Sequence, residues 1–392
     1  MTERISVGTI ADLQASAAQL TGLSDFGDVS YRTGLTTLLD SYAEDEELTP
    51  LGCKIKRAEL RGALVARLLS EAAWTQYPAS ADVPIERPIF VTGLPRTGTT
   101  ALHRLLCADP AAQGLEQWLC EVPQPRPPRD SWPDNPIFQH IQHGFEQFHA
   151  ANPEFAGVHY IAADTVEECW QLLRQSAMSI SYESLAHVPG YSAWLARQNW
   201  TPAYARHRRN LQLIGLNDAG KRWVLKNPSH LFALDALLAV YPDALIVQTH
   251  RDPRVAVASS CSLSALATRG HSTRFVGGTL GADQLDLLAR GAALFAASRA
   301  RHDPDRFVDV QYEDLVGDPV GTVAGVYAAF GLPFDEQVRA AVTAEDAASR
   351  AGARAPAHRY TLADFGLTGA DVDARFADYV ATHRPAPGTM DG

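Results

Sequence analysis

The sequence lacks the features of a membrane-spanning or secreted protein. No apolar run approaches the length of about 20 residues that crosses a bilayer. The amino-terminal stretch MTERISVGTIADLQ does not place an apolar segment after a basic one, as a signal peptide does. The five cysteines are widely spaced and include no C-x-x-C pair, which argues against a zinc site or a disulfide framework. We therefore expect a soluble, cytoplasmic protein with reduced thiols.

Long runs of like charge are also absent. The 392-residue chain has 34 Lys and Arg residues against 45 Asp and Glu residues, a formal net charge of −11. This balance argues against nonspecific nucleic-acid binding and against a polybasic membrane contact. An anionic substrate would therefore need a local basic pocket. With 46% apolar residues, the composition is that of a folded globular protein.

The order of the predicted elements indicates an α/β fold. Residues 1–86 are expected to form an N-terminal helical extension, because apolar residues recur there at helical spacing and β-rich runs are absent. Residues 87–392 contain short apolar runs, each followed by a helical pattern. The predicted strands are PIFVTG (88–93), RWVLK (222–226), ALIVQTH (244–250) and RFVDVQY (306–312). This alternation predicts a parallel sheet flanked by helices, with ligand-binding residues at the carboxyl ends of its strands.

Two stretches interrupt this alternation. Residues 121–136 contain six prolines and are predicted to form a stiff surface excursion, because proline fits neither a regular helix nor a central strand. Residues 164–215 return to the pattern of amphipathic helices. Residues 121–215 are therefore expected to form a helical insertion in the parallel domain.

The stretch VTGLPRTGTT, residues 91–100, is similar to a phosphate-binding loop that lacks its lysine. A Walker A loop reads G-x-x-x-x-G-K-[ST], and here Gly93 and Gly98 keep the spacing while Thr99 replaces the lysine. A strand precedes the loop and a helix follows it, so backbone N–H groups and a helix N-terminus would face an anion. The candidate ligands of a phosphate are Arg96, Thr97, Gly98, Thr99 and Thr100.

The missing lysine argues against an ATP-dependent kinase. In nucleotide triphosphatases this lysine reaches the β- and γ-phosphates beside a magnesium ion. No acidic residue ends a predicted strand as a magnesium ligand would, since RWVLK ends in Lys226 and ALIVQTH is followed by Arg251. We expect a phosphate that side chains neutralise, with no metal required. A P-loop kinase and a noncatalytic nucleotide-binding protein are the alternatives.

A second candidate phosphate-binding motif follows the predicted strand at residues 244–250. Arg251 follows a predicted strand, and Ser259 lies eight residues later in the following helix; they could hold a second phosphate or serve only in packing and ion pairing. The combination of LPRTGTT, THRDPRVAVASS and QYEDLVGDP, within residues 88–320, resembles the sulfotransferases that use 3′-phosphoadenosine 5′-phosphosulfate (PAPS), especially their actinobacterial members. The resemblance implies that residues 96–100 bind the 5′-phosphosulfate and that Arg251 and Ser259 bind the 3′-phosphate. The product would be adenosine 3′,5′-bisphosphate.

The C-terminal part departs from the R-K-G ending that is frequent in this family. Residues 353–367, ARAPAHRYTLADFGL, are instead similar to the H-x-Y-x-L-x-x-F-G-L ending of bacterial relatives. This similarity makes Arg359 a candidate phosphate ligand, with a solvated loop as the alternative. The stretch YEDL, which begins at Tyr312, is interpreted as a structural turn from strand to helix, in which Asp314 pairs with a nearby arginine.

Sulfuryl transfer needs a cation for the leaving oxygen and a base for the acceptor hydroxyl. Lys226 ends a strand at the expected rim and matches the lysine that relatives carry there. The base remains open among three candidates. Glu116 lies where glutamate-using relatives place their base; Glu168, with Glu167 beside it, opens a predicted helix; and His230 follows Lys226 closely. Thr165 and Glu168 also form a capping-box pattern, which would make Glu168 structural.

The acceptor is expected to be a small molecule, lipid or glycoside that carries a hydroxyl or phenol. The regions 1–86 and 121–215 are the expected enclosure of this acceptor. Seven aromatic residues in or near these regions are available as walls of the acceptor site, although most of them are expected in the core. These aromatic residues are Trp118, Trp132, Phe138, Phe145, Phe148, Tyr160 and Trp170. A homodimer is the common assembly for a soluble enzyme of this kind.

Overall fold

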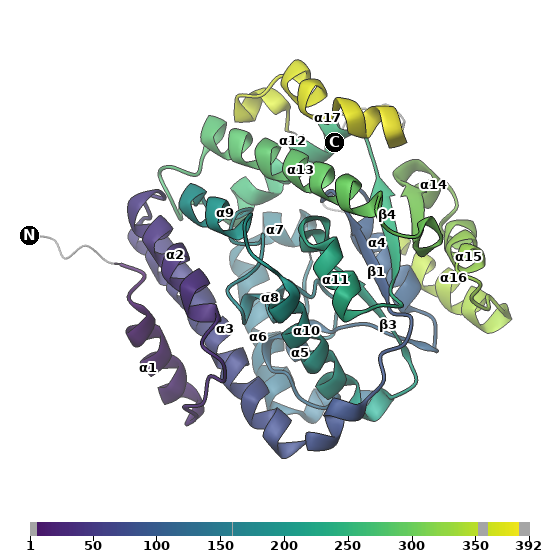
Figure 1. The fold of residues 1–392 in the computed structure, drawn as a ribbon, viewed down its shortest axis with the longest axis horizontal. Helices are drawn as coiled ribbons and strands as arrows, with labels where there is room; N and C mark the ends of the chain where they lie inside the picture. Colours follow the sequence, from purple (N-terminus) through teal and green to yellow (C-terminus); the bar gives the residue numbers. More distant parts are fainter. Residues whose placement is uncertain (1–5, 159, 352–359, 384–392) are drawn as a thin grey trace, which may run out of the picture.

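The centre of the fold is a parallel sheet, seen on the right of Figure 1. The computed structural model describes residues 6–158, 160–351 and 360–383. Five parallel strands lie in the order β2-β3-β1-β4-β5. They are β1 (Ile89–Gly93), β2 (Ala112–Gln113), β3 (Arg222–Lys226), β4 (Leu245–His250) and β5 (Phe307–Gln311). The predicted α/β class and four predicted strands are confirmed, whereas β2, only two residues long, was not predicted.

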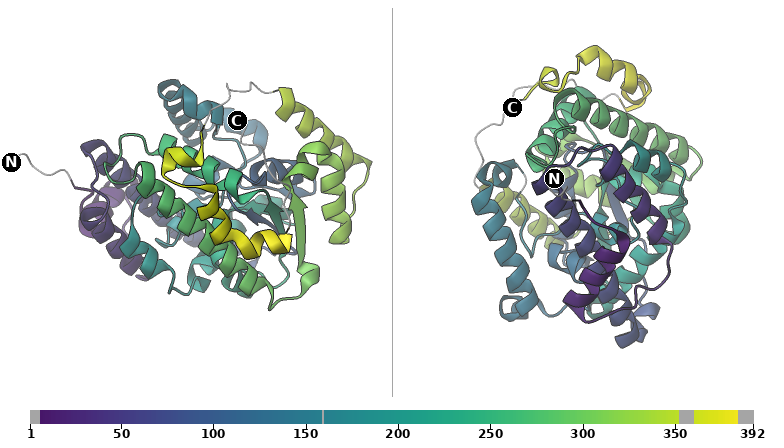
Figure 2. Two further views of the ribbon diagram at one scale, coloured as in Figure 1. Left: turned by 90° about the horizontal axis from the view of Figure 1, so that it is seen from above. Right: turned by 90° about the vertical axis from the view of Figure 1, so that its left-hand side faces the viewer.

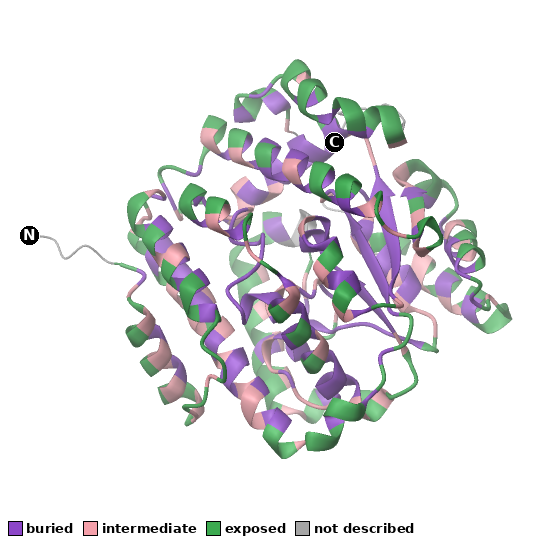
Figure 3. Cartoon of the chain, in the orientation of Figure 1, coloured by how far each residue is buried: buried purple, intermediate pink, exposed green. Residues whose placement is uncertain are grey.

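The two faces of the sheet bury two separate apolar cores. Phe90 and Leu225 point into the larger core, and Val91 and Val224, their neighbours along the strands, point into the smaller one. All four side chains are fully buried, and Figure 3 shows the strands as buried almost throughout. A strand that is buried on both faces has a continuous apolar sequence, which is why these strands were predictable.

Helices cover both faces. The smaller core lies under α4 (Thr99–Cys107), α14 (Tyr312–Gly317), α15 (Pro319–Ala329) and α16 (Glu336–Ala351). The larger core lies under α10 (Thr201–Ile214), α11 (Leu234–Val240), α12 (Pro253–Ala267), α13 (Gly277–Arg299) and α17 (Gly369–His383). Figure 2 shows the C-terminal α17, in yellow, lying across α12 and α13. Short 3-10 helices connect these elements: η1 (Pro78–Asp82), η2 (Arg129–Asp134), η3 (Gly215–Asp218), η4 (Pro228–Phe232), η5 (Pro304–Arg306) and η6 (Leu362–Phe365).

The residues before β1 are helical, as predicted. They form α1 (Ile10–Thr21), α2 (Tyr31–Glu44) and α3 (Pro50–Gln76). These helices share the larger core with the rest of the chain. The buried Arg67 of α3 donates hydrogen bonds to the carbonyl oxygen of Gln175 at 3.0 Å and to Asp28 Oδ2 at 2.8 Å. A buried guanidinium that joins α3 to the α8–α10 region anchors the N-terminal helices to the wall of the site described below.

The predicted helical insertion is only partly helical. It follows α5 (Gln117–Glu121) and contains α10 together with α6 (Pro136–Ala151), α7 (Pro153–Val158), α8 (Trp170–Arg174) and α9 (Pro189–Leu195). Residues 175–188, predicted as part of an amphipathic helix, run through turns instead. Ala177 has a φ of +52°, a left-handed conformation that interrupts a right-handed helix. The prediction of continuous helices over residues 164–215 was therefore wrong in this segment.

The proline-rich stretch is not simply a surface excursion. Residues 122–128 lack regular structure, as predicted, but Arg126 within them is buried. Its guanidinium donates to Glu116 Oε2 at 3.1 Å, Asp218 Oδ2 at 2.8 Å, Gln113 Oε1 at 2.7 Å and the Gly114 carbonyl at 2.6 Å. These four contacts hold the stretch against β2, because a buried guanidinium needs acceptors for its donors.

The strand register brings the predicted site residues to one edge. Gly93 at the end of β1 lies opposite Thr249 of β4, and Val91 lies opposite Lys226, the last residue of β3. The loop after β1, the end of β3 and Arg251 after β4 therefore leave the sheet side by side, as the rule for parallel sheets predicts.

Candidate active site

The loop after β1 depends on two glycines. Gly93 has a φ of +146° and Gly98 a φ of +88°, conformations that residues with a side chain rarely adopt. A Cβ atom added to Gly93 would lie 2.5 Å from Thr249 Oγ1, and one added to Gly98 would lie 2.9 Å from Leu315 Cδ2. The loop is thus packed tightly against β4 and α14. Since α4 begins at Thr99, the loop delivers the backbone N–H groups at that helix N-terminus to the edge of the sheet.

The threonines of the loop have different tasks. The fully buried Thr97 directs its hydroxyl inward, 2.6 Å from the Leu94 carbonyl oxygen and 2.5 Å from Thr249 Oγ1. Its side chain therefore fixes the loop, and only its backbone N–H remains for a ligand. Thr100 instead accepts a hydrogen bond from Lys226, as described below.

Arg96, Ser259 and Arg251 form one cluster, although 163 residues separate Arg96 from Ser259. Arg96 Nε donates a hydrogen bond to Ser259 Oγ at 3.1 Å, and Arg251 Nη1 donates to the Arg96 carbonyl oxygen at 3.0 Å. The guanidinium of Arg251 also stacks on the ring of Tyr312 at 3.9 Å. The structure thus brings the two predicted phosphate-binding motifs together, and the stacking role of Tyr312 was missed from the sequence.

This cluster is electropositive. Burial lowers the pKa of Arg96 because it disfavours the charged form, and repulsion from the charge of Arg251 acts in the same direction. Within the described part of the chain, no carboxylate lies within 4.0 Å of either guanidinium. A cavity of about 410 Å³ opens beside the cluster, and its charged lining residues are Arg96, Arg104, Arg350, Glu345 and Asp346, of which Arg350 and Asp346 pair with each other. Two half-buried guanidiniums without a carboxylate partner within 4.0 Å among the described residues favour an anionic ligand.

Lys226 connects this cavity to a second one. Its side chain is 1% exposed, and Nζ donates hydrogen bonds to Thr100 Oγ1 at 2.9 Å and to Glu168 Oε1 at 3.0 Å. Thr100 lines the smaller cavity. Glu168 lines a larger cavity of about 920 Å³, to which Pro95 of the loop also contributes. The ammonium group therefore lies at the boundary between an anion site and an open cavity.

Glu168 does not form the capping box that its spacing suggested. Helix α8 begins at Trp170, and Thr165 Oγ1 is bonded to the backbone of Ala162, at 3.1 Å from the nitrogen and 2.8 Å from the oxygen. A short bridge between Glu116 and Val166 holds this segment extended, so that no helix can start at Thr165. The structural interpretation of Glu168 as a cap was therefore wrong, and its carboxylate is bonded to Lys226 instead.

The other candidate bases lie apart from Lys226. The buried Glu116 accepts its hydrogen bond from Arg126, and burial raises the pKa of Glu116 while the charge of Arg126 opposes this shift. Glu116 is not among the residues that line the two cavities, whereas Glu167 lines the larger one and pairs with Arg104 at 3.5 Å. His230 is bonded through Nδ1 to the Tyr204 hydroxyl at 2.7 Å and through Nε2 to Cys169 Sγ at 3.5 Å. Burial lowers its pKa far below the usual value.

The larger cavity is mostly apolar. Of the aromatic residues proposed as walls, Phe145, Phe148 and Trp170 line this cavity, and Tyr160 lines the smaller one. The other three, Trp118, Trp132 and Phe138, pack on one another with ring centroids 5.5–5.9 Å apart. Aliphatic residues complete the wall, namely Leu51, Ile55, Ile161, Ile180, Leu185, Leu263, Leu266, Leu287 and Leu288. These aliphatic residues were not predicted as cavity walls, because a helix face that borders a cavity has the same apolar pattern as a helix face in a core.

The C-terminal motif is described only in part. Arg359, a predicted phosphate ligand, and His358 lie outside the described residues. Tyr360 packs against the larger core, and its hydroxyl lies close enough to Arg96 to influence the pKa of that guanidinium. The described end of this segment is therefore near the anion site, as the motif predicted. The role of Arg359 stays a prediction.

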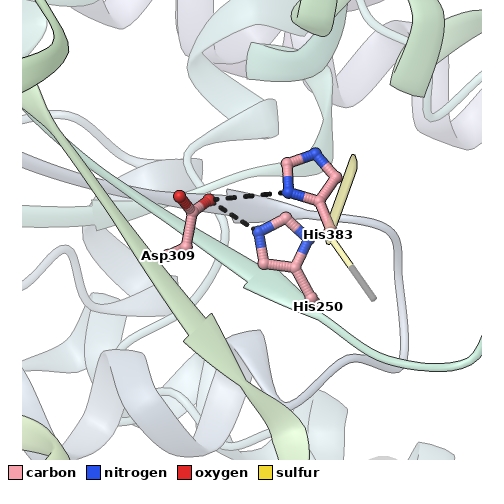
Figure 4. Close-up of side chains that lie close together, drawn as sticks. All are labelled: His250, Asp309 and His383. Atoms are coloured by element: carbon pink, nitrogen blue, oxygen red, sulfur yellow. Dashed lines mark hydrogen bonds and ion pairs between the residues drawn. The ribbon is translucent and has the colours of Figure 1, made fainter. Parts of the chain in front are cut away.

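Beside Arg251, the strand end is braced by His250, Asp309 and His383 (Figure 4). His250 Nε2 lies 2.7 Å from Asp309 Oδ1, its ring stacks on that of His383 at 4.0 Å, and Arg299 holds both oxygens of Asp309. Two imidazoles and a carboxylate resemble a metal-ligand set, but the charge of Arg299 already balances the carboxylate. The cluster fixes α17 against β4 directly before Arg251. In the YEDL stretch, no ion pair of Asp314 is found among the described residues.

Comparison with known proteins agrees with this geometry. A profile of the sulfotransferase family matches residues 88–336. The crystal structure of sulfotransferase STF1 from Mycobacterium tuberculosis H37Rv superposes with a TM-score of 0.90 at 58% identity, covering 96% of this chain and 100% of that one. That of sulfotransferase STF9 from Mycobacterium avium gives a TM-score of 0.88 at 28% identity, covering 100% of both chains.

Two further sulfotransferases are similar to this chain in sequence, at 27% identity. The omega-hydroxy-beta-dihydromenaquinone-9 sulfotransferases Stf3 of Mycobacterium bovis and Mycobacterium tuberculosis are 27% identical over 254 residues, which is 62% of this chain. The chain spans about 63% of the length of these two relatives. Within the described ranges, no helix is both long and apolar enough to cross a membrane.

Proposed function

Because the chain belongs to the sulfotransferase family, we propose that it transfers the sulfuryl group of PAPS to a hydroxyl group of an apolar acceptor. The observation that carries this proposal is the convergence of Arg96 and Arg251 on the loop after β1, without a carboxylate partner in the described part of the chain. Two guanidiniums at one site suit a ligand with phosphate groups at two positions. PAPS, when bound, supplies the sulfuryl group.

The smaller cavity, together with Arg251 and Ser259 of the cluster beside it, would hold the donor. Arg96 and the backbone N–H groups from Thr97 to Thr100, at the start of α4, would bind the 5′-phosphosulfate. Arg251 and Ser259 would bind the 3′-phosphate. Arg359 remains a predicted further ligand from the C-terminal segment.

Lys226 and Glu168 would serve the transfer itself. Lys226 lies against Thr100 of the loop, where an ammonium group stabilises negative charge on the oxygen that leaves the sulfur. Glu168 lies on the acceptor side of Lys226, where its carboxylate can take the proton of the attacking hydroxyl. Glu116, the other glutamate predicted as a base, receives no part in the transfer, because Arg126 holds it outside both cavities.

The acceptor would occupy the larger cavity. Its volume of about 920 Å³ and its aliphatic and aromatic walls suit an extended apolar molecule. The name of Stf3 gives omega-hydroxy-beta-dihydromenaquinone-9 as the acceptor of that relative, which supports an acceptor with a hydroxyl group on an apolar body.

The proposed role of Arg251 as a ligand of the 3′-phosphate can be tested by measuring nucleotide affinities. We expect the wild-type protein to bind adenosine 3′,5′-bisphosphate at least about tenfold more tightly than 5′-AMP, because hydrogen bonds to a charged group contribute about 1.5–3 kcal/mol. In Arg251→Ala this preference should fall to about twofold or less. Isothermal titration calorimetry with both nucleotides measures the ratio directly.

Arg254→Ala provides the matched control. Arg254 is three residues further on, is exposed, and donates from Nε to Asp373 at 2.8 Å. Its loss should leave the preference unchanged. If Arg251→Ala keeps the full preference for the 3′-phosphorylated nucleotide, then Arg251 serves only the loop and its stacking on Tyr312.

A further inference from the structure

Charged side chains line part of the larger cavity, although an apolar acceptor would not need them for binding. Five glutamates line it: Glu59, Glu121, Glu154, Glu167 and Glu168. Four of them pair with a lysine or arginine at 2.9–3.5 Å. The fifth, Glu121, accepts a hydrogen bond from the Gln117 amide at 2.8 Å. Every carboxylate of the cavity wall is therefore already engaged by a neighbouring side chain.

Arg174 differs from these residues. It ends α8, is only 8% exposed and lines the cavity. Its Nε donates to Ser181 Oγ at 2.8 Å and its Nη1 to Gln171 Oε1 at 3.3 Å, so both acceptors are neutral. Nη2 has no hydrogen-bond partner among the described residues, and no carboxylate of those residues lies within 4.0 Å of the guanidinium.

The position of this guanidinium is fixed. The rings of Trp170 and Tyr182 lie 4.7 and 5.3 Å from Arg174 Cζ. Together with the bonds to Ser181 and Gln171, these contacts hold the guanidinium in one orientation. A pre-oriented guanidinium loses little conformational freedom when it binds a planar anion.

A buried guanidinium that no carboxylate contacts is costly, because the charge is removed from water and Glu59 and Glu121 act on it only from beyond 4.0 Å. An anionic group in the cavity would remove this cost and take up the free donor. We propose that Arg174 binds a carboxylate of the acceptor, so that the acceptor is an apolar hydroxy acid. This inference rests on the proposed function, because it takes the larger cavity as the acceptor site.

The glutamates of the wall do not oppose such a ligand strongly. Four of them are balanced by a paired cation, and burial raises the pKa of Glu121, although the Gln117 amide and the charge of Arg174 act against this shift. A higher pKa favours the neutral form of Glu121 beside a bound anion. Of the two described arginines that line the cavity, Arg269 pairs with Glu154, and Arg174 is therefore the one that can meet the anion.

The test uses simple probes on the whole protein loaded with adenosine 3′,5′-bisphosphate. Calorimetry compares ω-hydroxydodecanoate with its methyl ester and with dodecanol. We expect the carboxylate to bind at least about tenfold more tightly than the ester or the alcohol. Equal affinities, or no binding of the carboxylate, would overturn the inference without any variant.

Variants locate the effect. Arg174→Met should reduce the preference for the carboxylate to about twofold or less while dodecanol binds as before, and Arg174→Glu should favour ω-aminododecanol. Arg269→Met is the matched control, since Arg269 also lines the cavity but pairs with Glu154 at 2.9 Å, and it should keep the wild-type preference. An undiminished preference in folded Arg174→Met overturns the inference. Failure of the proposed function would appear differently, as a protein that binds no adenosine 3′,5′-bisphosphate.

Discussion

Replacing Lys226 with methionine is expected to lower the turnover number by about two to three orders of magnitude. Methionine has a similar length but no charge, so the leaving oxygen would lose the ammonium group that lies 2.9 Å from Thr100 Oγ1. Binding of adenosine 3′,5′-bisphosphate should change little, because the proposed ligands of the phosphates are Arg96, Arg251 and the backbone of the loop. The measurement is the rate of transfer from PAPS at saturating acceptor, together with the affinity for adenosine 3′,5′-bisphosphate.

Lys221→Met is the control for this prediction. Lys221 is half exposed and pairs with Asp218 at 3.0 Å, away from both cavities. Its replacement should leave the turnover number within about twofold of the wild type, as is usual for a surface ion pair. Two results would contradict the role of Lys226: an unchanged turnover number, or a loss that is explained entirely by weaker nucleotide binding.

Glu168→Gln should have a comparable effect, a loss of about 10²–10⁴ in the turnover number. The glutamine side chain keeps the shape of the glutamate and still offers Lys226 an oxygen, but it cannot take the proton of the acceptor hydroxyl. The KM for the acceptor should change much less than the turnover number, because the apolar wall that we propose as the acceptor site is untouched. Steady-state kinetics with PAPS and an alcohol acceptor separate the two quantities.

Glu116→Gln distinguishes a base from a buried structural carboxylate. Because Glu116 accepts a hydrogen bond from Arg126 at 3.1 Å, its replacement should lower the free energy of unfolding by about 1–3 kcal/mol and leave the turnover number nearly unchanged. His230 is also bonded at both ring nitrogens and should likewise affect stability rather than transfer. Full activity in Glu168→Gln combined with a large loss in Glu116→Gln would reverse the assignment.

Much of the fold was predictable from local pattern. The strands at 88–93, 222–226, 244–250 and 306–312 are short apolar runs that are buried on both faces, and this is the pattern that sequence reasoning recognises best. Strand β2 was not predicted, because its two residues form a strand only by pairing with Arg222 and Trp223, which lie more than a hundred positions further along the chain. The left-handed Ala177 and its turn carried no signal in the sequence either.

The site residues were predictable from the sequence only where ligand binding requires a fixed spacing between residues that are close along the chain. Gly93 and Gly98 revealed the loop because their backbone conformations require glycine. The choice between Glu116 and Glu168 was not predictable, because it depends on which cation each carboxylate meets. Lys226 lies 58 residues from Glu168, and the position of Arg126 follows from the path of the proline-rich stretch. The capping-box pattern of Thr165 and Glu168 suggested a helix start that is not observed. The β-bridge between Val166 and Glu116 overrides the local helix propensity there.

Thermal unfolding of the wild-type protein with added nucleotides tests the nature of the donor most directly. A ligand that binds only the folded state at a hundred times its Kd adds about 2.7 kcal/mol to the free energy of unfolding. Adenosine 3′,5′-bisphosphate should raise the Tm in a concentration-dependent manner, whereas ATP with magnesium should have little effect, since Thr99 replaces the lysine that would reach the γ-phosphate. Stabilisation by ATP with magnesium and none by adenosine 3′,5′-bisphosphate would contradict a PAPS-dependent sulfotransferase.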